Sequence, residues 1–405
     1  MKKLLVFCLA IGALNAQSLL EYKEPYQDTL FSMIDSLHQR KIDAAKERTE
    51  AIRDSYPERE RKKLYASVEG LDIPVSPDIF DTHFHFPPEN QGRTGTCWAF
   101  AGVSLIESDL KRRQNKEIRI SVMYVVRMEY LEKARYFIRQ RGESSFGRGS
   151  QLNAVFTIAD TYGLVPESRY HGNLTKYGHD NKALYEELKR YLDFIKDNDY
   201  WDEKTALASV RAILDKHLGN SPETFIYKGK LYTPVTFYRD VLQFESNDYM
   251  AVQSTQRFPF HTYCDFPYPD NWRHEENFYN LPLDEFYHAI VSAVKNGYPV
   301  AIGGDTSEPG YNRYQDVAFV PEADIPPGRI DQDVREYRIY NGSTGDDHGV
   351  HIVGYKSING KDWFLIKDSS RNAYTGNFPG YYFYRGDYIR LKMLTAAVPR
   401  KFVEK

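Results

Sequence analysis

Hydrophobic residues recur at helical intervals through the first half of the chain. The spacing predicts a helix from Cys97 to about Asn115, with basic residues at its carboxyl end and a buried side made of Trp98, Ala99, Ala101, Val103, Leu105, Ile106 and Leu110. Further helices are predicted near residues 121–140, 151–162, 181–197 and 204–217, with turns at Gly147, Gly149 and Gly163.

The last third of the chain carries short apolar runs with β character. They extend from Pro299 to Gly303, Val350 to Tyr355, Trp363 to Ile366 and Tyr381 to Tyr384. Glycine and asparagine separate these runs without regular helices, which favours an antiparallel sheet or barrel. A helical half followed by a strand half predicts an α+β fold.

The first residues are typical of a signal peptide. Two lysines precede an apolar run from Leu4 to Leu14, and Ala16 provides a small residue for cleavage. The run is too short to anchor the protein across a bilayer. We therefore expect residues 1–16 to be removed on export to a periplasmic or extracellular location of bacterial type.

The remaining chain divides by composition. Residues 17–70 predict a charged helical extension, which we interpret as a solvated amphipathic helix pair in preference to a removable pro-segment or an oligomer arm. Residues 71–170 form the expected helical half and residues 282–395 the strand half. The polar block at 171–281 is interpreted as an inserted subdomain, and 396–405 as a C-terminal tail.

Composition narrows the classes of partner. The 405 residues are 41% hydrophobic and 27% charged, as in soluble globular proteins. A net charge of -3 offers no basic surplus for nucleic acid or an anionic membrane, so we expect neither as a partner after signal removal, while a homo-oligomer stays open.

After signal removal, Cys97 and Cys264 would be the remaining cysteines, too few for a disulfide framework. His83 and His85 lack further ligands at metal-binding spacing, so we expect no metal ion and no cofactor.

The segment from Gln91 to Phe100 carries the most specific chemical signal. Cys97 stands at a turn where a helix begins, and the positive end of the helix dipole favours its thiolate. Gln91 precedes it by six positions and can donate a side-chain hydrogen bond to an oxyanion formed in acyl transfer. Nucleophile and oxyanion donor are thus expected in one short segment.

A cysteine nucleophile needs a base, and the base needs an orienting group. His348 heads one predicted strand, and Asp368 ends the next. If these strands pair, Asp368 can accept a hydrogen bond from one ring nitrogen of His348 while the other nitrogen faces the thiol. An imidazolium beside a thiolate stabilises both charges.

These segments resemble a known family. The stretch from Gln91 to Phe100 resembles the active-site segment of papain-like cysteine peptidases, and the stretches 348–355 and 364–369 resemble their histidine strand and third catalytic strand. Other runs resemble the bleomycin hydrolase or aminopeptidase C branch: Gly149-Ser150-Gln151, Tyr162-Gly163-Leu164-Val165-Pro166, Tyr279-Asn280-Leu281-Pro282 and Gly297-Tyr298-Pro299-Val300. The resemblance covers about residues 71–390 and implies a papain-like fold with a helical insertion.

The resemblance implies a mechanism of peptide hydrolysis. Cys97 would attack the scissile carbonyl, and His348 would act as base and then as acid. Gln91 and the backbone N–H of Cys97 would hold the oxyanion, and Asp368 would orient His348. Trp98, Gly149 and Ser150 are expected to contact the substrate. An aminopeptidase is expected in preference to a papain-like endopeptidase.

The chain departs from the family pattern after its third strand. The family usually has asparagine where Asp368 stands and Ser-Trp-Gly where this chain has Ser369, Ser370 and Arg371. The missing tryptophan would shield the third catalytic residue from water, and Trp363 and Tyr374 are candidates to replace it. The altered segment leaves two alternatives open: a transglutaminase-like acyltransferase, which also uses Cys, His and Asp, and a non-catalytic peptide-binding protein.

Overall fold

The computed structural model describes residues 37, 39–40, 43–44, 63–174 and 178–404. The chain separates into two compact units, Met1–Lys63 and Leu64–Lys405. The predicted signal peptide at 1–16 and most of the predicted extension at 17–70 lie outside the described residues. In the described part of the chain, no helix has both the length and the apolar character needed to cross a membrane.

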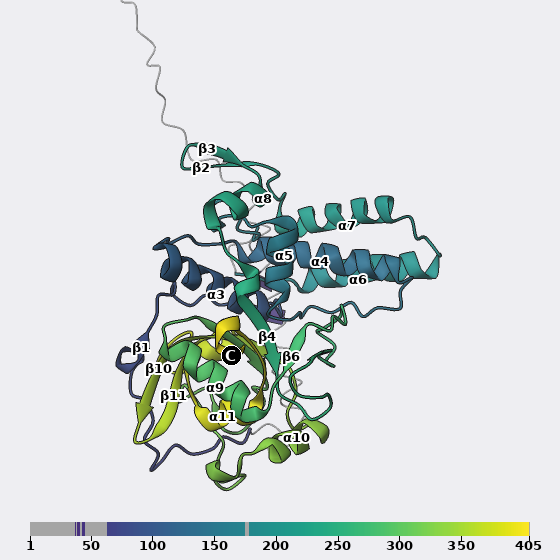
Figure 1. The fold of residues 1–405 in the computed structure, drawn as a ribbon. Coiled ribbons are helices and arrows are strands. Elements are labelled where there is room, and N and C mark those ends of the chain that lie inside the picture. The colour runs from purple at the N-terminus through teal and green to yellow at the C-terminus, as the bar shows by residue number, and fades with distance from the viewer. Residues whose placement is uncertain (1–36, 38, 41–42, 45–62, 175–177, 405) are drawn as a thin grey trace, which may run out of the picture. The chain divides into compact units, whose positions relative to one another are not determined.

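One layer of the second unit is helical. The predicted helices are confirmed as α3 (Cys97–Gln114), α4 (Val122–Arg139), α5 (Ala154–Tyr162), α6 (Lys182–Asp197) and α7 (Glu203–Leu218). Figure 1 shows α6 and α7 alongside α4, and apolar side chains from all of these helices share one core with the short helix α8 (Pro234–Phe237).

Polar residues define where these helices begin. The hydroxyl of Ser121 accepts a hydrogen bond from the backbone N–H of Tyr124 at the start of α4, and Asp202 accepts one from Thr205 at the start of α7. Such caps satisfy N–H groups that have no partner within the helix. α3 ends at Gln114, and the next residue, Asn115, adopts the left-handed conformation with φ of 53°, which stops a helix.

The second layer is a large, mostly antiparallel sheet. Among the described residues its strand order is β5-β6-β4-β13-β7-β10-β11-β12-β9-β8, with β1 paired to β10. The strands are β1 (Asp81–Thr82), β4 (Tyr249–Gln253), β5 (Tyr263–Cys264), β6 (Phe278–Asn280), β7 (Val300–Gly304), β8 (Tyr311–Asn312), β9 (Val317–Ala318), β10 (His348–Ile358), β11 (Lys361–Lys367), β12 (Tyr381–Arg385) and β13 (Met393–Pro399). A helical layer with this sheet confirms the α+β prediction.

Three helices accompany the sheet. α9 (Leu283–Lys295) and α11 (Gly386–Lys392) pack against its strands (Figure 1), and α10 (Gln332–Tyr340) contacts α11. A separate hairpin joins β2 (Phe225–Tyr227) to β3 (Lys230–Tyr232). Short turns of 3-10 or π helix are η1 (Pro77–Ile79), η2 (Glu167–Arg169), η3 (Tyr238–Leu242), η4 (Ser246–Asp248), η5 (Pro327–Arg329), η6 (Arg371–Tyr374) and η7 (Arg400–Phe402).

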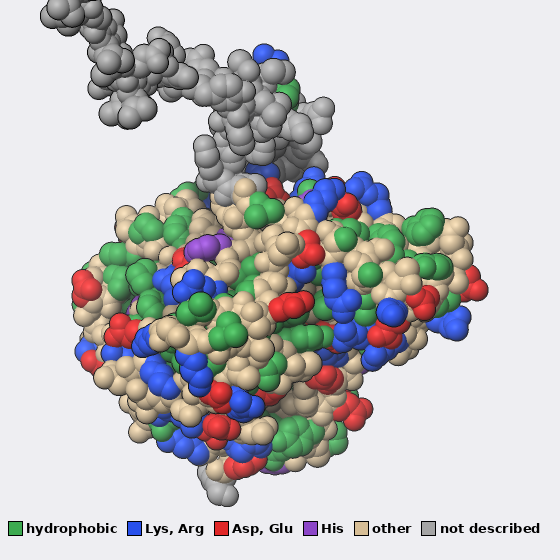
Figure 2. Space-filling view, turned by 90° about the horizontal axis from the view of Figure 1, so that it is seen from above, with side chains coloured by type: hydrophobic (Ala, Val, Ile, Leu, Met, Phe, Trp, Pro, Cys, Tyr) green, Lys and Arg blue, Asp and Glu red, His purple; other side chains and the backbone are tan. Residues whose placement is uncertain are grey.

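The segment that we expected to form an inserted subdomain contributes to both layers of the structure. Within residues 171–281, α6 and α7 join the helical core, whereas β4, β5 and β6 extend the main sheet through the pairing of β4 with β13. β13 itself runs to Pro399, beyond the boundary expected at residue 395. On the face shown in Figure 2, acidic and basic side chains are interspersed.

Candidate active site

Cys97 is the first residue of α3 and lies where that helix meets the sheet. It is a free, partly exposed thiol. The preceding loop is held by Thr94, whose hydroxyl donates to the backbone carbonyl of Gln91 at 2.8 Å and lies 2.5 Å from the hydroxyl of Thr96. α3 packs on β10 and β7, so the start of the helix faces the strand that begins with His348.

His348 connects the thiol to a carboxylate. Its Nε2 lies 2.8 Å from Oδ1 of Asp368, and its ring also interacts with Cys97. Because Asp368 occupies Nε2, Nδ1 is the nitrogen left for the sulfur. Burial alone would lower the pKa of His348, but the charges of Asp368 and Cys97 and the hydrogen bonds to both raise that pKa well above its usual value.

Asp368 follows β11 and is fully buried. Its Oδ1 also accepts a hydrogen bond from the backbone N–H of Ser370 at 2.6 Å. Burial opposes the negative charge, but the charge of His348 and the hydrogen bonds from His348 and Ser370 hold the pKa of Asp368 below its usual value. Asp368 is therefore an ionised partner for His348 at neutral pH.

Gln91 is held by the residue after Asp368. Its backbone N–H donates to the carbonyl of Ser369 at 2.8 Å, and the hydroxyl of Ser369 donates to Oε1 of the Gln91 side chain at 2.7 Å. Since the oxygen of the side-chain amide is occupied, its N–H₂ group is left to donate elsewhere. An oxyanion donor requires a free N–H₂ group of this kind.

The two candidate shields lie in different surroundings. Trp363 is buried in an apolar cluster with Phe80, Val353 and Phe383. Tyr374 is half-buried in η6, and burial, followed by the negative charge of Asp368, raises the pKa of its hydroxyl. Of these two candidates, Tyr374 is the one that interacts with Asp368, and its role as a shield stays a prediction.

The expected substrate contacts are placed as follows. Trp98 is only 2% exposed and belongs to the helical core. The hydroxyl of Ser150 donates to the buried carboxylate of Glu129. Gly149 lies so close to Asp270 that a Cβ at this position would fall 1.9 Å from Oδ2 of the carboxylate. Whether Trp98, Gly149 and Ser150 contact substrate stays a prediction.

One acidic residue close to His348 was not predicted from the sequence. Asp346 is half-buried and accepts a hydrogen bond from Nε2 of Gln151 at 2.9 Å. Burial raises the pKa of Asp346 to about 7, and the charge of Asp270 adds to this effect. The sequence offered one signal, a pair of aspartates immediately before the histidine.

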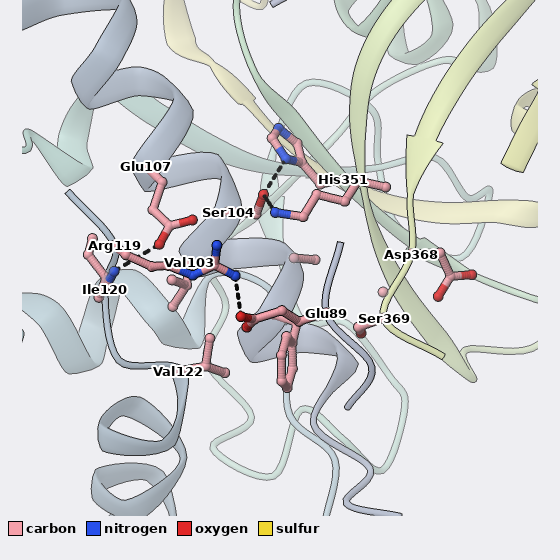
Figure 3. A pocket seen from close by; sticks show the side chains of 14 residues that line it. Glu89, Val103, Ser104, Glu107, Arg119, Ile120, Val122, His351, Asp368 and Ser369 are labelled. Carbon is pink, nitrogen blue, oxygen red and sulfur yellow. Dashed lines mark hydrogen bonds and ion pairs between the residues drawn. The ribbon is translucent and has the colours of Figure 1, made fainter. Parts of the chain in front are cut away.

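A polar cavity lies between α3 and the strands that carry the site residues (Figure 3). Ser104 lies in it, 2.9 Å from Nδ1 of His351, and accepts a hydrogen bond from Nζ of Lys367 at 2.9 Å. Glu107 interacts electrostatically with Lys367 and accepts a hydrogen bond from the backbone of Ile120 at 2.8 Å. The buried polar groups thus connect the helical layer to β10 and β11.

Fold and site together have the arrangement of a papain-like cysteine peptidase. The sequence profile of the Peptidase C1-like family matches residues 76–317, and the chain belongs to this family. The matched range includes Gln91 and Cys97 and ends before His348 and Asp368.

Known proteins show the same likeness. Human bleomycin hydrolase is 24% identical over 269 residues, which are 55% of this chain and 59% of that protein. Procathepsin L of Felis catus is 24% identical over 188 residues, 45% of this chain and 53% of that protein. The matches therefore span just over half the length of these curated relatives. The crystal structure of pepw from Lactobacillus rhamnosis shares the fold, with a TM-score of 0.66 at 17% identity over 90% of this chain and 92% of that one. These findings confirm the resemblance to papain-like peptidases of the bleomycin hydrolase branch.

Proposed function

We propose that this chain hydrolyses peptide bonds with Cys97 as nucleophile, His348 as proton carrier, Asp368 as its orienting group and Gln91 as oxyanion donor. One observation carries the proposal: His348 interacts with both Cys97 and Asp368, and the contact with Asp368 uses Nε2, which leaves Nδ1 for the sulfur. A nucleophile, a base and an orienting group in series are what covalent acyl transfer requires. Membership of the Peptidase C1-like family supports peptide bonds as the substrate class.

The proposed reaction has two stages. The thiolate of Cys97 attacks the scissile carbonyl, and the imidazolium of His348 gives its proton to the leaving amine, which leaves an acyl-enzyme thioester. His348 then takes a proton from water, which attacks the thioester and releases the acid. In both stages the backbone N–H of Cys97 and the side-chain N–H₂ of Gln91 donate to the oxyanion.

Two modes of cleavage are proposed, in order of preference. The resemblance to the bleomycin hydrolase branch favours an aminopeptidase. A papain-like endopeptidase is the second candidate. The position of the C-terminal tail favours it, because only a tail that lies over Cys97 would restrict the site to the ends of peptides. Lys401 donates to the hydroxyl of Tyr298 at 2.6 Å, and Arg112 stacks on the same ring at 3.7 Å. Arg112 lies near the far end of α3, about 20 Å along the helix from Cys97 at 1.5 Å per residue, so this part of the tail leaves the thiol accessible to longer peptides.

Matched dye-linked peptides with free and with acetylated N-termini test the proposal. An aminopeptidase cleaves only the free peptide, and an endopeptidase cleaves both. Cys97→Ala should abolish either activity, while Cys264→Ala, which changes the other free cysteine of the described chain, should retain it. Full hydrolysis by Cys97→Ala would contradict the proposed mechanism.

A further inference from the structure

The second carboxylate oxygen of Asp368 has a partner that the sequence does not single out. Oδ1 is hydrogen-bonded to both Nε2 of His348 and the backbone N–H of Ser370. Oδ2 accepts a hydrogen bond from the hydroxyl of Tyr311 at 3.1 Å. Since Asp368 is fully buried, bulk water cannot replace this donor.

The position of Tyr311 is fixed on several sides. It lies in β8, which pairs with β9, and its ring stacks on Tyr382 with 4.5 Å between centroids and 26° between planes. The preceding residue must be small, because a Cβ on Gly310 would fall 1.9 Å from the backbone oxygen of Phe319. Tyr311 is 5% exposed, so its hydroxyl is held at Asp368 by packing.

The hydroxyl is suited to donate. Burial, followed by the negative charge of Asp368, raises the pKa of Tyr311 well above its usual value, so the group stays protonated in the neutral range. An asparagine at position 368 would carry its own N–H₂ group, whereas a buried carboxylate is acceptor-only and needs donors at both oxygens. Tyr311 meets a need that arises from the aspartate.

We propose that Tyr311 is a positioning residue whose hydroxyl disperses charge from Oδ2 of Asp368 and so limits how tightly Oδ1 holds the proton of His348. The inference rests on the proposed function, because it concerns the same Cys97–His348 pair. Without the hydroxyl, the carboxylate is a stronger base and retains the imidazolium more firmly. The loss of the His348 proton then moves to higher pH.

The pH dependence of Cys97 alkylation by iodoacetamide tests this inference without peptide turnover. The alkaline step in the rate reports loss of the His348 proton, and intact mass follows the reaction. In Tyr311→Phe we expect this step to rise by about one pH unit, the size that a hydrogen bond to a charged group implies. A purely structural role would change the rate at every pH and leave the step in place.

Two controls separate the hydroxyl from its surroundings. Tyr384→Phe removes a buried hydroxyl for which the described residues provide no hydrogen-bond partner, and its alkaline step should match that of the wild type. In an Asp368→Asn background, Tyr311→Phe should move the step no further than Asp368→Asn alone. An unshifted step in Tyr311→Phe, or an equal shift in Tyr384→Phe, overturns the inference while leaving the proposed function intact. Failure of wild-type Cys97 to react at any pH contradicts both.

A second substitution covers the case in which Tyr311→Phe does not fold. Incorporation of 3-fluorotyrosine at position 311 keeps the ring and gives a more acidic hydroxyl, which is a stronger donor. The alkaline step should then move to lower pH, opposite to its shift in Tyr311→Phe. A step that stays in place or rises would contradict the role assigned to Tyr311.

Discussion

The chemistry of the site depends on a carboxylate at position 368. The resemblance already indicated this departure from asparagine, and the structure adds its consequence: the charge of Asp368 helps to raise the pKa of His348 against the effect of burial. A charged orienting group holds the histidine as imidazolium over a wider range of pH than an amide would. The cost of burying Asp368 is offset by three donors, His348, Ser370 and Tyr311.

Asp368→Asn should lower the pH at which activity is lost on the alkaline side. The amide can still accept a hydrogen bond from His348, but it lacks the charge that raises the pKa of the imidazole, so the pKa should fall by about one unit or more. The pH profile of kcat/KM on a dye-linked peptide measures this change. An alkaline limb at the wild-type position would contradict the electrostatic role of Asp368.

Ser369→Ala should reduce kcat through Gln91. The hydroxyl of Ser369 fixes Oε1 of the Gln91 amide at 2.7 Å, and its loss frees the amide to rotate. We expect a loss of roughly 10-fold, smaller than the 10²- to 10³-fold loss that removal of an oxyanion donor by Gln91→Ala should cause. The double variant should be no slower than Gln91→Ala alone. An additive loss in the double variant would show that Ser369 acts independently of Gln91.

Two histidines close to the contact between α3 and β10 are held in the neutral form by burial: His83, which follows β1, and His351 on β10. His83 and His351 lie with their ring centroids 5.4 Å apart, and Nε2 of each has no hydrogen-bond partner among the described residues. Burial, with smaller effects of His85 and Arg112, lowers the pKa of His83 to about 3, and burial lowers the pKa of His351 well below its usual value. With Lys367 also close to His351, positive charge faces these rings from several elements.

Acid should therefore destabilise this contact. His83 has a pKa near 6.5 in the unfolded chain and about 3 in the folded one, so the unfolded state binds more protons between these values. Its contribution to stability is complete above about pH 6.5 and is lost as the pH falls towards 3. His83→Gln should reduce the difference in free energy of unfolding between pH 7 and pH 5, measured by urea denaturation. His288→Gln, at an exposed histidine, should leave that difference unchanged, and a wild-type-like difference in His83→Gln would contradict the prediction.

Much of the architecture followed from patterns in the sequence, and the parts that did not depend on contacts between distant residues. Apolar spacing located α3 to α7 within a few residues, because apolar residues recur at helical intervals in each of them. The roles of β4, β5 and β6 were not predictable, because strands this short join the sheet only through pairing with β13 and with each other. Likewise, the sequence motif singled out His348 and Asp368, whereas Tyr311 is recognised only from its contact across the sheet.

The two layers of the second unit are joined by buried charge as well as by apolar packing. Glu107 on α3 interacts with Lys367 on β11, and burial raises the pKa of Glu107 while the charge of Lys367 opposes that rise. Glu107→Gln should remove the negative charge that acts on Lys367 and lower the free energy of unfolding by more than the loss of a surface ion pair does. Glu117→Gln is the control, since Glu117 pairs with Lys111 at the surface, where an ion pair contributes about 1 kcal/mol or less. Equal effects of the two substitutions, measured by urea denaturation at pH 7, would contradict this account of the layer contact.

The covalent intermediate provides the decisive measurement for the site as a whole. We would quench the enzyme in acid during turnover of a peptide ester, digest it, and locate any acyl group by mass spectrometry. The proposed mechanism predicts a thioester on Cys97, with no acyl group on Cys264 and little accumulation in His348→Ala. Turnover at the wild-type rate with acylation at another residue, or undiminished turnover in Cys97→Ala, would contradict it.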